Sequence, residues 1–360
     1  MAYYHSSYGS PRKKNGKWKR IVFFFFLILV LIAVAAGYLL YNIILKPNIW
    51  TPDDEPVAIT IPTGTDYEGV KNIIYSQGLI INRKYFEWLA EKKNYPQLVK
   101  PGKYLINNKM NNNDLINILR SGDQEPVQLI FNNIRGIYQL AGRVSTQIEA
   151  DSVSIVDILT DSAYLSLLGL QKETASILFN PNTYEMFWNT SAEGFVKRMH
   201  EEYVEFWNGN RTSTANDMNL SIAEVVTLAS IVEKETNKND EKPIIAGVYI
   251  NRLKAGWRLQ ADPTVIYAIG DYNIKRVLNV HKEVNSPYNT YRVSGLPPGP
   301  ICIPSIASID AVLNYDHNSY LFFCAKDDLS GYHAFAKNNR QHAKNAKKYQ
   351  EALNKMGVYK

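Results

Sequence analysis

The most constraining feature of the chain is an apolar run at residues 21–45, 25 residues without a charge, with four consecutive phenylalanines at 23–26. As a helix rising about 1.5 Å per residue it would be roughly 37 Å long, enough to cross a hydrocarbon layer of about 30 Å. A cleaved signal peptide would have an apolar region of only about 7–15 residues, ending at a small-residue site. Tyr41 and Asn42 do not resemble such a site. The sequence therefore predicts an uncleaved transmembrane helix.

Charge gives this helix an orientation. Six Lys and Arg residues lie between Arg12 and Arg20, and the first acidic residue is Asp53. The positive-inside rule places residues 1–20 in the cytoplasm and the rest of the chain outside it. Of the 40 basic residues in the chain, 34 follow the tail, against 34 acidic residues, so the exported part is formally neutral. This balance gives no support for nucleic-acid binding.

The exported part is expected to have an α+β fold with a small module ahead of a larger domain. Residues 46–56 contain three prolines and three acids and predict an extended linker. Residues 57–122 predict a strand, two helices and a second strand in that order, with Thr65 and Asn82 as helix caps. A short helix then ends at Gly122.

Residues 123–360 predict a helix-rich domain with short β-sheets. Asp262 followed by Pro263 is expected to be a helix cap and first helical residue. The expected strands lie at 127–131, 320–325 and 332–336, and the last two form a hairpin. Expected helices lie at 137–148, 154–170 and 192–207. Further helices are expected to start at 222, to run from near Asp240 to Gly256, and to follow the caps Ser305 and Asn338.

The helix starting at residue 222 has an unusual end. A capping box formed by Ser221 and Glu224 opens it, and few polar residues follow before 232, as in a buried helix. It nevertheless closes with the sequence Glu233-Lys-Glu235. Burial and the helix dipole would raise the pKa of a carboxyl there, and a carboxyl protonated near neutral pH suits a general acid, although neighbouring lysines oppose the shift. A solvated helix end is the ordinary alternative.

Other chemistries lack their motifs. The six histidines are scattered and show no metal-ligand spacing, so neither a metal nor a cofactor is expected. There is no phosphate-binding loop and no nucleophile-elbow motif. Cys302 and Cys324 favour two separate buried thiols, with a single disulfide left open.

Several motifs occur in a set order along the larger domain. They are LASIVEKET at 228–236, GVYINRL at 247–253, LQADPTVIY at 259–267, SPYNTY at 286–291, GLPPGPI at 295–301 and GYHAF at 331–335. In this order they closely resemble the endolytic murein transglycosylases of the MltG or YceG-like family. The module at 57–122 resembles that family's LysM-like subdomain, and a single N-terminal anchor in a bacterial cell membrane also fits.

The resemblance implies a lytic transglycosylase without a cofactor. Such an enzyme cuts the β-1,4 bond between N-acetylmuramic acid and N-acetylglucosamine, and the muramoyl 6-hydroxyl closes on C1 to leave a 1,6-anhydro end. Glu233 matches the family's catalytic glutamate, which protonates the leaving oxygen and then accepts the hydroxyl proton. The partners implied are peptidoglycan strands and penicillin-binding synthases, with a role in ending nascent strands. The polar residues expected to bind the glycan are Asn251, Gln260, Asp262, Thr264, Asn289, Tyr291 and His333.

Three positions depart from the family pattern. Asn182 replaces an aspartate, Ala336 a small hydroxyl residue and Ser305 a glycine. None of them is expected to touch Glu233. Two other functions stay open at this stage: a hydrolase that uses water with Asp262 or Glu235 as its second carboxylate, and an anchored wall-binding protein without activity.

Overall fold

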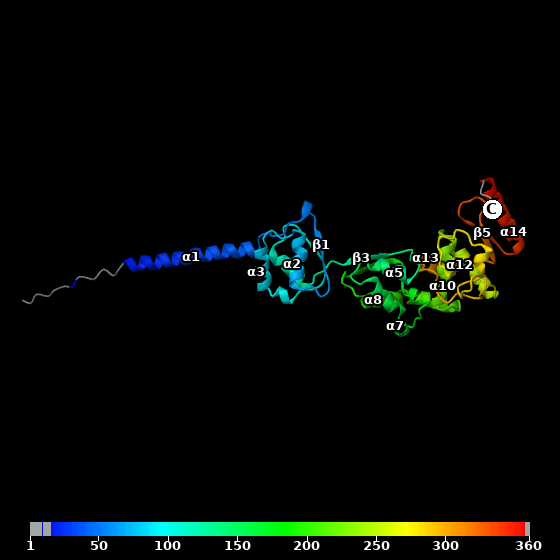
Figure 1. Ribbon diagram of the computed structural model, residues 1–360, viewed down its shortest axis with the longest axis horizontal. Coiled ribbons are helices and arrows are strands. Elements are labelled where there is room, and N and C mark those ends of the chain that lie inside the picture. The colour runs from blue at the N-terminus through cyan, green and yellow to red at the C-terminus, as the bar shows by residue number, and fades with distance from the viewer. Residues whose placement is uncertain (1–8, 10–15, 357–360) are drawn as a thin grey trace, which may run out of the picture. The chain divides into compact units, whose positions relative to one another are not determined.

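The computed structural model describes Gly9 and residues 16–356. Its helices are α1 (Gly16–Ile44), α2 (Tyr67–Ser76), α3 (Arg83–Lys92), α4 (Asn112–Ser121), α5 (Ile137–Val144), α6 (Ser152–Thr160), α7 (Ser162–Leu167), α8 (Ala192–Phe206), α9 (Asn210–Asp217), α10 (Ile222–Glu235), α11 (Lys242–Lys254), α12 (Asp262–Ile269), α13 (Ile306–Leu313) and α14 (Asn339–Lys355). Its strands are β1 (Val57–Ile61), β2 (Gly102–Ile106), β3 (Val127–Phe131), β4 (Asn182–Met186), β5 (Phe322–Ala325) and β6 (His333–Ala336), shown with the helices in Figure 1.

Helix α1 confirms the apolar helix, and it begins five residues before the predicted start. It is 29 residues long, and the most apolar part of it is not buried by the rest of the protein. It is therefore long and apolar enough to cross a membrane. Most of the expected cytoplasmic tail, including Arg12, Lys13 and Lys14, lies outside the described residues, so the orientation of the helix stays a prediction.

The chain divides into two compact units between Glu125 and Pro126. The first unit contains the expected order of strand, two helices and strand, with β1 antiparallel to β2 from the pair Val57–Ile106 onward. Asp66 rather than Thr65 caps α2, because its carboxylate accepts a hydrogen bond from the Gly69 amide. The likeness of this unit to a LysM module stays a prediction.

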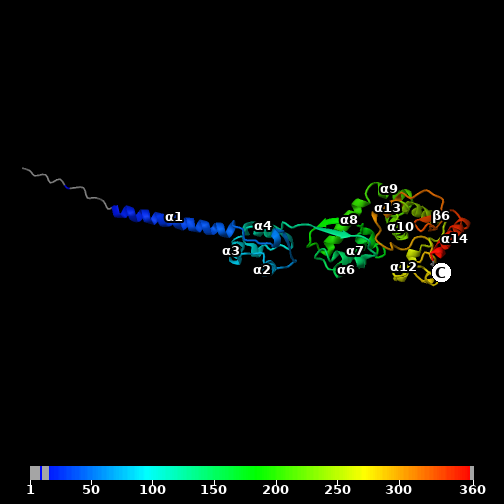
Figure 2. The same ribbon diagram turned by 90° about the horizontal axis from the view of Figure 1, so that it is seen from above.

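Residues 46–56 are integrated into the first unit rather than forming a free linker. Asn48 is 4% exposed, and its side chain bonds both Asn82 and Asn112. Asn112 in turn donates 2.7 Å to the carbonyl of Ile43, in the last turn of α1. Both ribbon views show α3 beside this end of α1 (Figures 1 and 2). The prolines did predict extended backbone, but the extended segment pairs with the module through an isolated bridge at Ile49.

The second unit has one continuous apolar core, with α10 inside it. Residues 225–232 of α10 are all buried, which confirms the buried helix expected from its sequence. Helices α11, α12 and α13 pack against α10, and Figure 2 shows α12 and α13 near it. Strand β3, which the sequence predicted, pairs antiparallel with β4, a strand that was not predicted. The hairpin of β5 and β6 is confirmed.

Three details of the second unit differ from expectation. Helix α5 already ends at Val144. Asp262 is the first residue of α12 instead of its cap, and its carboxylate accepts a hydrogen bond from the Tyr291 hydroxyl. The two cysteines are free thiols, as favoured by the sequence, but only Cys302 is buried while Cys324 is partly exposed.

Candidate active site

Glu233 lies in the last turn of α10, and its carboxylate is held by side chains from two neighbouring helices. The hydroxyl of Ser305, the cap of α13, donates to Glu233 Oε2 at 2.6 Å, and the hydroxyl of Ser308 donates to the same oxygen. The ammonium of Lys242, at the start of α11, lies 3.0 Å from it. The Glu233 side chain is 27% exposed, whereas that of Lys242 is 5% exposed. All three donors therefore fix one carboxylate oxygen at the edge of the core.

These donors reverse the pKa shift expected for Glu233. Burial pushes the pKa of Glu233 upward, but the hydrogen bonds from Ser305 and Ser308 and the ammonium of Lys242 together outweigh burial. The pKa of this carboxyl consequently lies below its ordinary value. The expectation of a raised pKa is wrong for Glu233, because the sequence did not show that three donors converge on it.

The carboxyl with a raised pKa is instead that of Glu235, two residues further on. Burial raises the pKa of Glu235 to about 7, opposed by a hydrogen bond from Tyr249 and assisted by the charge of Asp262. The Tyr249 hydroxyl donates at 2.5 Å to Glu235, and the tyrosine is almost fully buried in α11. The two carboxyls of the Glu-Lys-Glu sequence thus have opposite electrostatic environments.

Three of the predicted glycan-binding residues donate side-chain hydrogen bonds to backbone carbonyls of the protein. Thr264 is fully buried, and its hydroxyl donates to the carbonyl of Ala261. Asn289 is also fully buried and donates to two backbone carbonyls of the preceding turn. Asn251 donates to the carbonyls of Asn318 and Tyr320, which ties α11 to the segment before β5. These contacts position backbone segments around α10.

The other predicted residues are more accessible. Gln260 and Asp262 are exposed, and Tyr291 is partly exposed. The charge of Asp262 acts on Glu235, and Tyr291 donates to Asp262, so these two side chains lie near Glu235. His333 is bonded through its ring and its amide to Glu241, a buried carboxylate that sequence reasoning did not single out.

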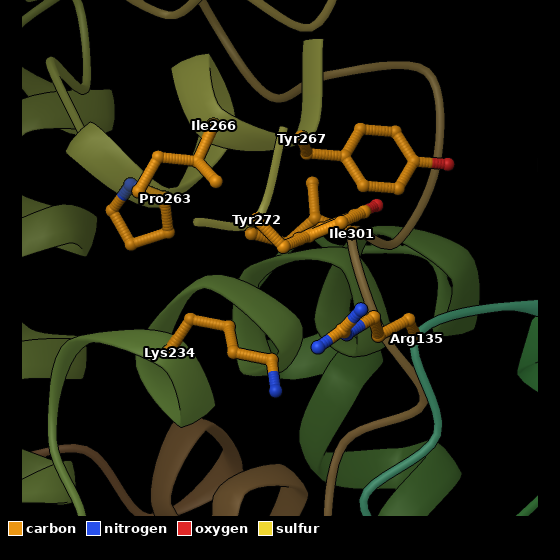
Figure 3. Close-up of a pocket in the computed structure, with 7 residues that line it drawn as sticks. All are labelled: Arg135, Lys234, Pro263, Ile266, Tyr267, Tyr272 and Ile301. Atoms are coloured by element: carbon orange, nitrogen blue, oxygen red, sulfur yellow. The ribbon is translucent and has the colours of Figure 1, made fainter. Parts of the chain in front are cut away.

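A cavity of about 230 Å³ opens beside the Glu-Lys-Glu sequence. Lys234 contributes to its wall, and so do Pro263 and Ile266 of α12. Figure 3 shows Lys234 and Arg135 on one side, with the α12 side chains opposite them. The end of α10 and the start of α12, both predicted as site segments, therefore meet at one cavity.

Comparison with known proteins identifies the family. The model of the YceG-like family matches residues 59–348. The chain belongs to the YceG-like family.

Relatives of this YceG-like chain carry a functional name. Proteins named endolytic murein transglycosylase are similar to it in Bacillus subtilis (strain 168), at 29% identity over 89% of this chain and 92% of that protein, and in Streptococcus pneumoniae (strain R6), at 28% identity over 86% and 62%. A crystal structure of a YceG-like protein from Listeria monocytogenes is similar with a TM-score of 0.54 and 26% identity, covering 81% of this chain and 98% of that one.

The structure also corrects the expectation about Ser305 in this YceG-like protein. Ser305 was expected not to touch Glu233, yet its hydroxyl is one of the three donors to that carboxylate. Ser308 stands in the first turn of the helix that Ser305 caps, and no sequence pattern marked it as a site residue. Lys242 gave no sequence signal, because a lysine at a helix start is usually solvated. Local patterns did not show that α11 and α13 both begin against the end of α10.

Proposed function

We propose that this protein is an endolytic lytic transglycosylase that cuts the N-acetylmuramic acid β-1,4 N-acetylglucosamine bond without water and leaves 1,6-anhydro ends, with Glu233 as its acid and base. The observation that carries the proposal is the carboxylate of Glu233, oriented by three donors at the end of a buried helix. Membership in the YceG-like family and the name shared by its relatives support the same activity.

The proposed reaction needs a single carboxyl. An ordinary glycosidase places two carboxyls around the bond, one for the leaving group and one for water or the sugar. In the proposed reaction the substrate supplies the nucleophile, so Glu233 first protonates the glycosidic oxygen and then takes the proton of the muramoyl 6-hydroxyl. Because the protein holds Oε2, we assign proton transfer to Oε1.

The depressed pKa of Glu233 adds a condition to this mechanism. A general acid must be protonated when the glycosidic bond breaks, but the donors on Oε2 favour the ionised form in the free protein. In our proposal the bound glycan covers the exposed part of the carboxyl and excludes water. The added desolvation raises the pKa toward the value that acid catalysis requires.

The predicted glycan-binding residues divide into two groups in this proposal. Gln260, Asp262 and Tyr291 are accessible and are proposed to contact acetamido and hydroxyl groups. The internally bonded side chains of Asn251, Thr264 and Asn289 are proposed to hold the backbone that presents these residues. His333, fixed by Glu241, is proposed to contact the glycan through its remaining ring nitrogen.

A digest of purified sacculi tests the activity. The full-length protein, Glu233→Gln and Glu235→Gln are each incubated with sacculi, and the released fragments are analysed by mass spectrometry. We expect anhydro ends from the wild type, a loss of at least about a thousandfold in rate for Glu233→Gln, and retained cutting by Glu235→Gln.

Each alternative function has its own outcome in this digest. Reducing ends instead of anhydro ends would identify a hydrolase with a second carboxylate, and loss of activity in Glu235→Gln alone would move the acid to that residue. Binding of sacculi without any cutting would leave an anchored wall-binding protein.

We further propose that α1 anchors the chain in a bacterial cell membrane, with the N-terminus in the cytoplasm and the catalytic unit outside, and that the protein acts beside penicillin-binding synthases on nascent strands. The apolar length of α1 supports the anchor. Protease digestion of intact cells should leave only the N-terminal end protected. A pull-down without any synthase, together with unchanged strand lengths after deletion, would contradict the second part.

A further inference from the structure

The cavity at the end of α10, which Lys234 lines, has a composition that its place in the site does not explain. Two cationic side chains, Lys234 and Arg135, lie in its wall, and no acidic residue is among the residues that line it. The remaining lining is apolar or aromatic, as Figure 3 shows: Pro263, Ile266, Tyr267, Tyr272 and Ile301. A neutral sugar alone gives no reason for two positive charges in this wall.

Neither cation is neutralised by the protein. Within residues 16–356, the hydrogen bond recorded for the Lys234 ammonium is to the amide oxygen of Asn133, at 3.4 Å, and no acid pairs with it. The guanidinium of Arg135 stacks on the ring of Tyr272 at 4.5 Å, and no acid pairs with it in that part of the chain either. The stacking restricts the guanidinium while leaving its in-plane donors available to an anion.

The cavity is sized for one substituent rather than a disaccharide. Its volume of about 230 Å³ is below the roughly 300–1,000 Å³ of pockets that enclose a whole drug-sized ligand. It also lies in the same part of the unit as the proposed reacting centre, because the charges of Lys234, in its wall, and of Glu233 both act on Cys302. Glu233 itself is not among the residues that line the cavity. A group bound here belongs to the sugar whose bond is cut, or to its immediate neighbour.

A second cavity, of about 350 Å³, continues from the first. It shares Arg135 and Tyr267 with it, and Lys172, Glu173 and Tyr288 are among the residues that it adds. Glu173 offsets the charge of Lys172, so the second cavity adds length past Arg135 without adding net positive charge. This length gives room for a chain longer than one carboxylate.

We propose that Lys234 and Arg135 form an anion subsite that takes a carboxylate carried by the muramoyl residue, and so places that residue against Glu233. This inference rests on the proposed function and names a determinant of its substrate. Two sources supply the same chemistry: the carboxylate of the lactyl group on a strand without peptides, and a carboxylate of the stem peptide attached to that group. Both occur only on the muramoyl sugar, so the subsite would set which of the two β-1,4 bonds in the strand meets the acid.

The test uses the full-length protein, the double variant Arg135→Gln/Lys234→Gln, and three glycan preparations. The first carries stem peptides, the second has been stripped by an amidase so that the lactyl carboxylate is free, and the third is the first with its carboxylates converted to neutral methylamides. A control variant, Lys197→Gln/Lys348→Gln, removes two exposed positive charges elsewhere in the second unit, so a general electrostatic effect on binding would appear there too.

We expect the site variant to lose about tenfold or more in kcat/KM on at least one of the two anionic glycans and to equal the wild type on the neutral one. Loss on the first glycan alone assigns the stem peptide, and loss on the second assigns the lactyl carboxylate. Equal activity of variant and wild type on all three glycans, or the same loss on the neutral glycan, overturns the proposal. A wild type that leaves reducing ends or cuts nothing contradicts the proposed function instead, and this is read before any variant is compared.

Discussion

The contact between Ser308 and Glu233 gives a prediction with an unusual sign, because removing a hydrogen bond at the site should raise activity at neutral pH. The Ser308 hydroxyl donates to the ionised carboxylate of Glu233 and thereby favours the form that is inactive as an acid. In Ser308→Ala this donor is lost, while those from Ser305 and Lys242 remain. The protonated form of Glu233 should then be more populated at any given pH.

The size of the effect follows from the bond that is removed. A hydrogen bond to a charged group contributes about 1.5–3 kcal/mol. We take the lower end, because Glu233 is 27% exposed and two other donors stay in place. About 1.4 kcal/mol corresponds to a factor of ten in the ratio of protonated to ionised carboxyl. We therefore expect kcat/KM to be up to about tenfold higher at pH 7, and the difference to vanish once both proteins are protonated at low pH.

The stability of Ser308→Ala provides a second measurement, because it should fall at the pH at which activity rises. A carboxyl whose pKa is depressed on folding stabilises the protein above its unfolded pKa, and this stabilisation is lost as the pH falls through the folded pKa. Ser308→Ala should therefore unfold more easily at pH 7, by about 1.5 kcal/mol, with the difference shrinking in acid. Thermal unfolding measured alongside the release of anhydro-ended fragments, both as a function of pH, gives the two curves.

Ser230→Ala is the matched control for Ser308→Ala. Ser230 is a buried serine of α10 that donates to the Thr227 carbonyl and accepts from the Ile301 amide, without touching Glu233. It should lower stability and leave the pH profile where it is. If Ser308→Ala instead loses the same fraction of activity at every pH, the hydroxyl positions the carboxylate and does not set its protonation.

The remaining predictions concern other parts of the chain. The melting temperature of the wild type should fall as the pH rises from about 5 to about 8, because the folded form of Glu235, with a pKa of about 7 against an ordinary 4.5, holds a proton that the unfolded chain has released; Glu235→Gln should remove this contribution to the slope. Asn112→Ala should leave the Ile43 carbonyl without its donor and cost about 1–3 kcal/mol, seen as faster amide hydrogen exchange in α4 of the full chain. Gly299→Ala should cost about 1–3 kcal/mol in denaturant unfolding, because its new Cβ would lie 2.0 Å from the backbone oxygen of Glu173, and an unchanged midpoint would show that the loop yields freely.

Local signals predicted most of the elements. Capping residues such as Asn82, Ser221, Ser305 and Asn338 marked helix starts correctly, because a cap is decided by a side chain and an amide within three residues of each other. Strand β4 was missed, since its sequence Asn-Thr-Tyr-Glu-Met has little strand character of its own and is stabilised by pairing with β3.

The site was harder to predict because it is assembled over long separations in the chain. The buried helix ending in two glutamates was visible, but the pKa of each depends on partners far along the sequence. Ser305 reaches Glu233 from 72 positions away, and Tyr249 reaches Glu235 from 14. Periodicity reports which face of a helix is buried and says nothing of the donors that another helix brings to its end.

The junction of α1 with the first unit has a mechanical consequence. A spanning helix responds to bilayer thickness by tilting. Asn112 of the first unit donates to the last turn of α1, and Asn48 belongs to the same hydrogen-bonded cluster. No flexible segment therefore separates α1 from the rest of the first unit. In the proposed membrane anchor, a change in lipid composition that tilts α1 would therefore turn the whole first unit with it.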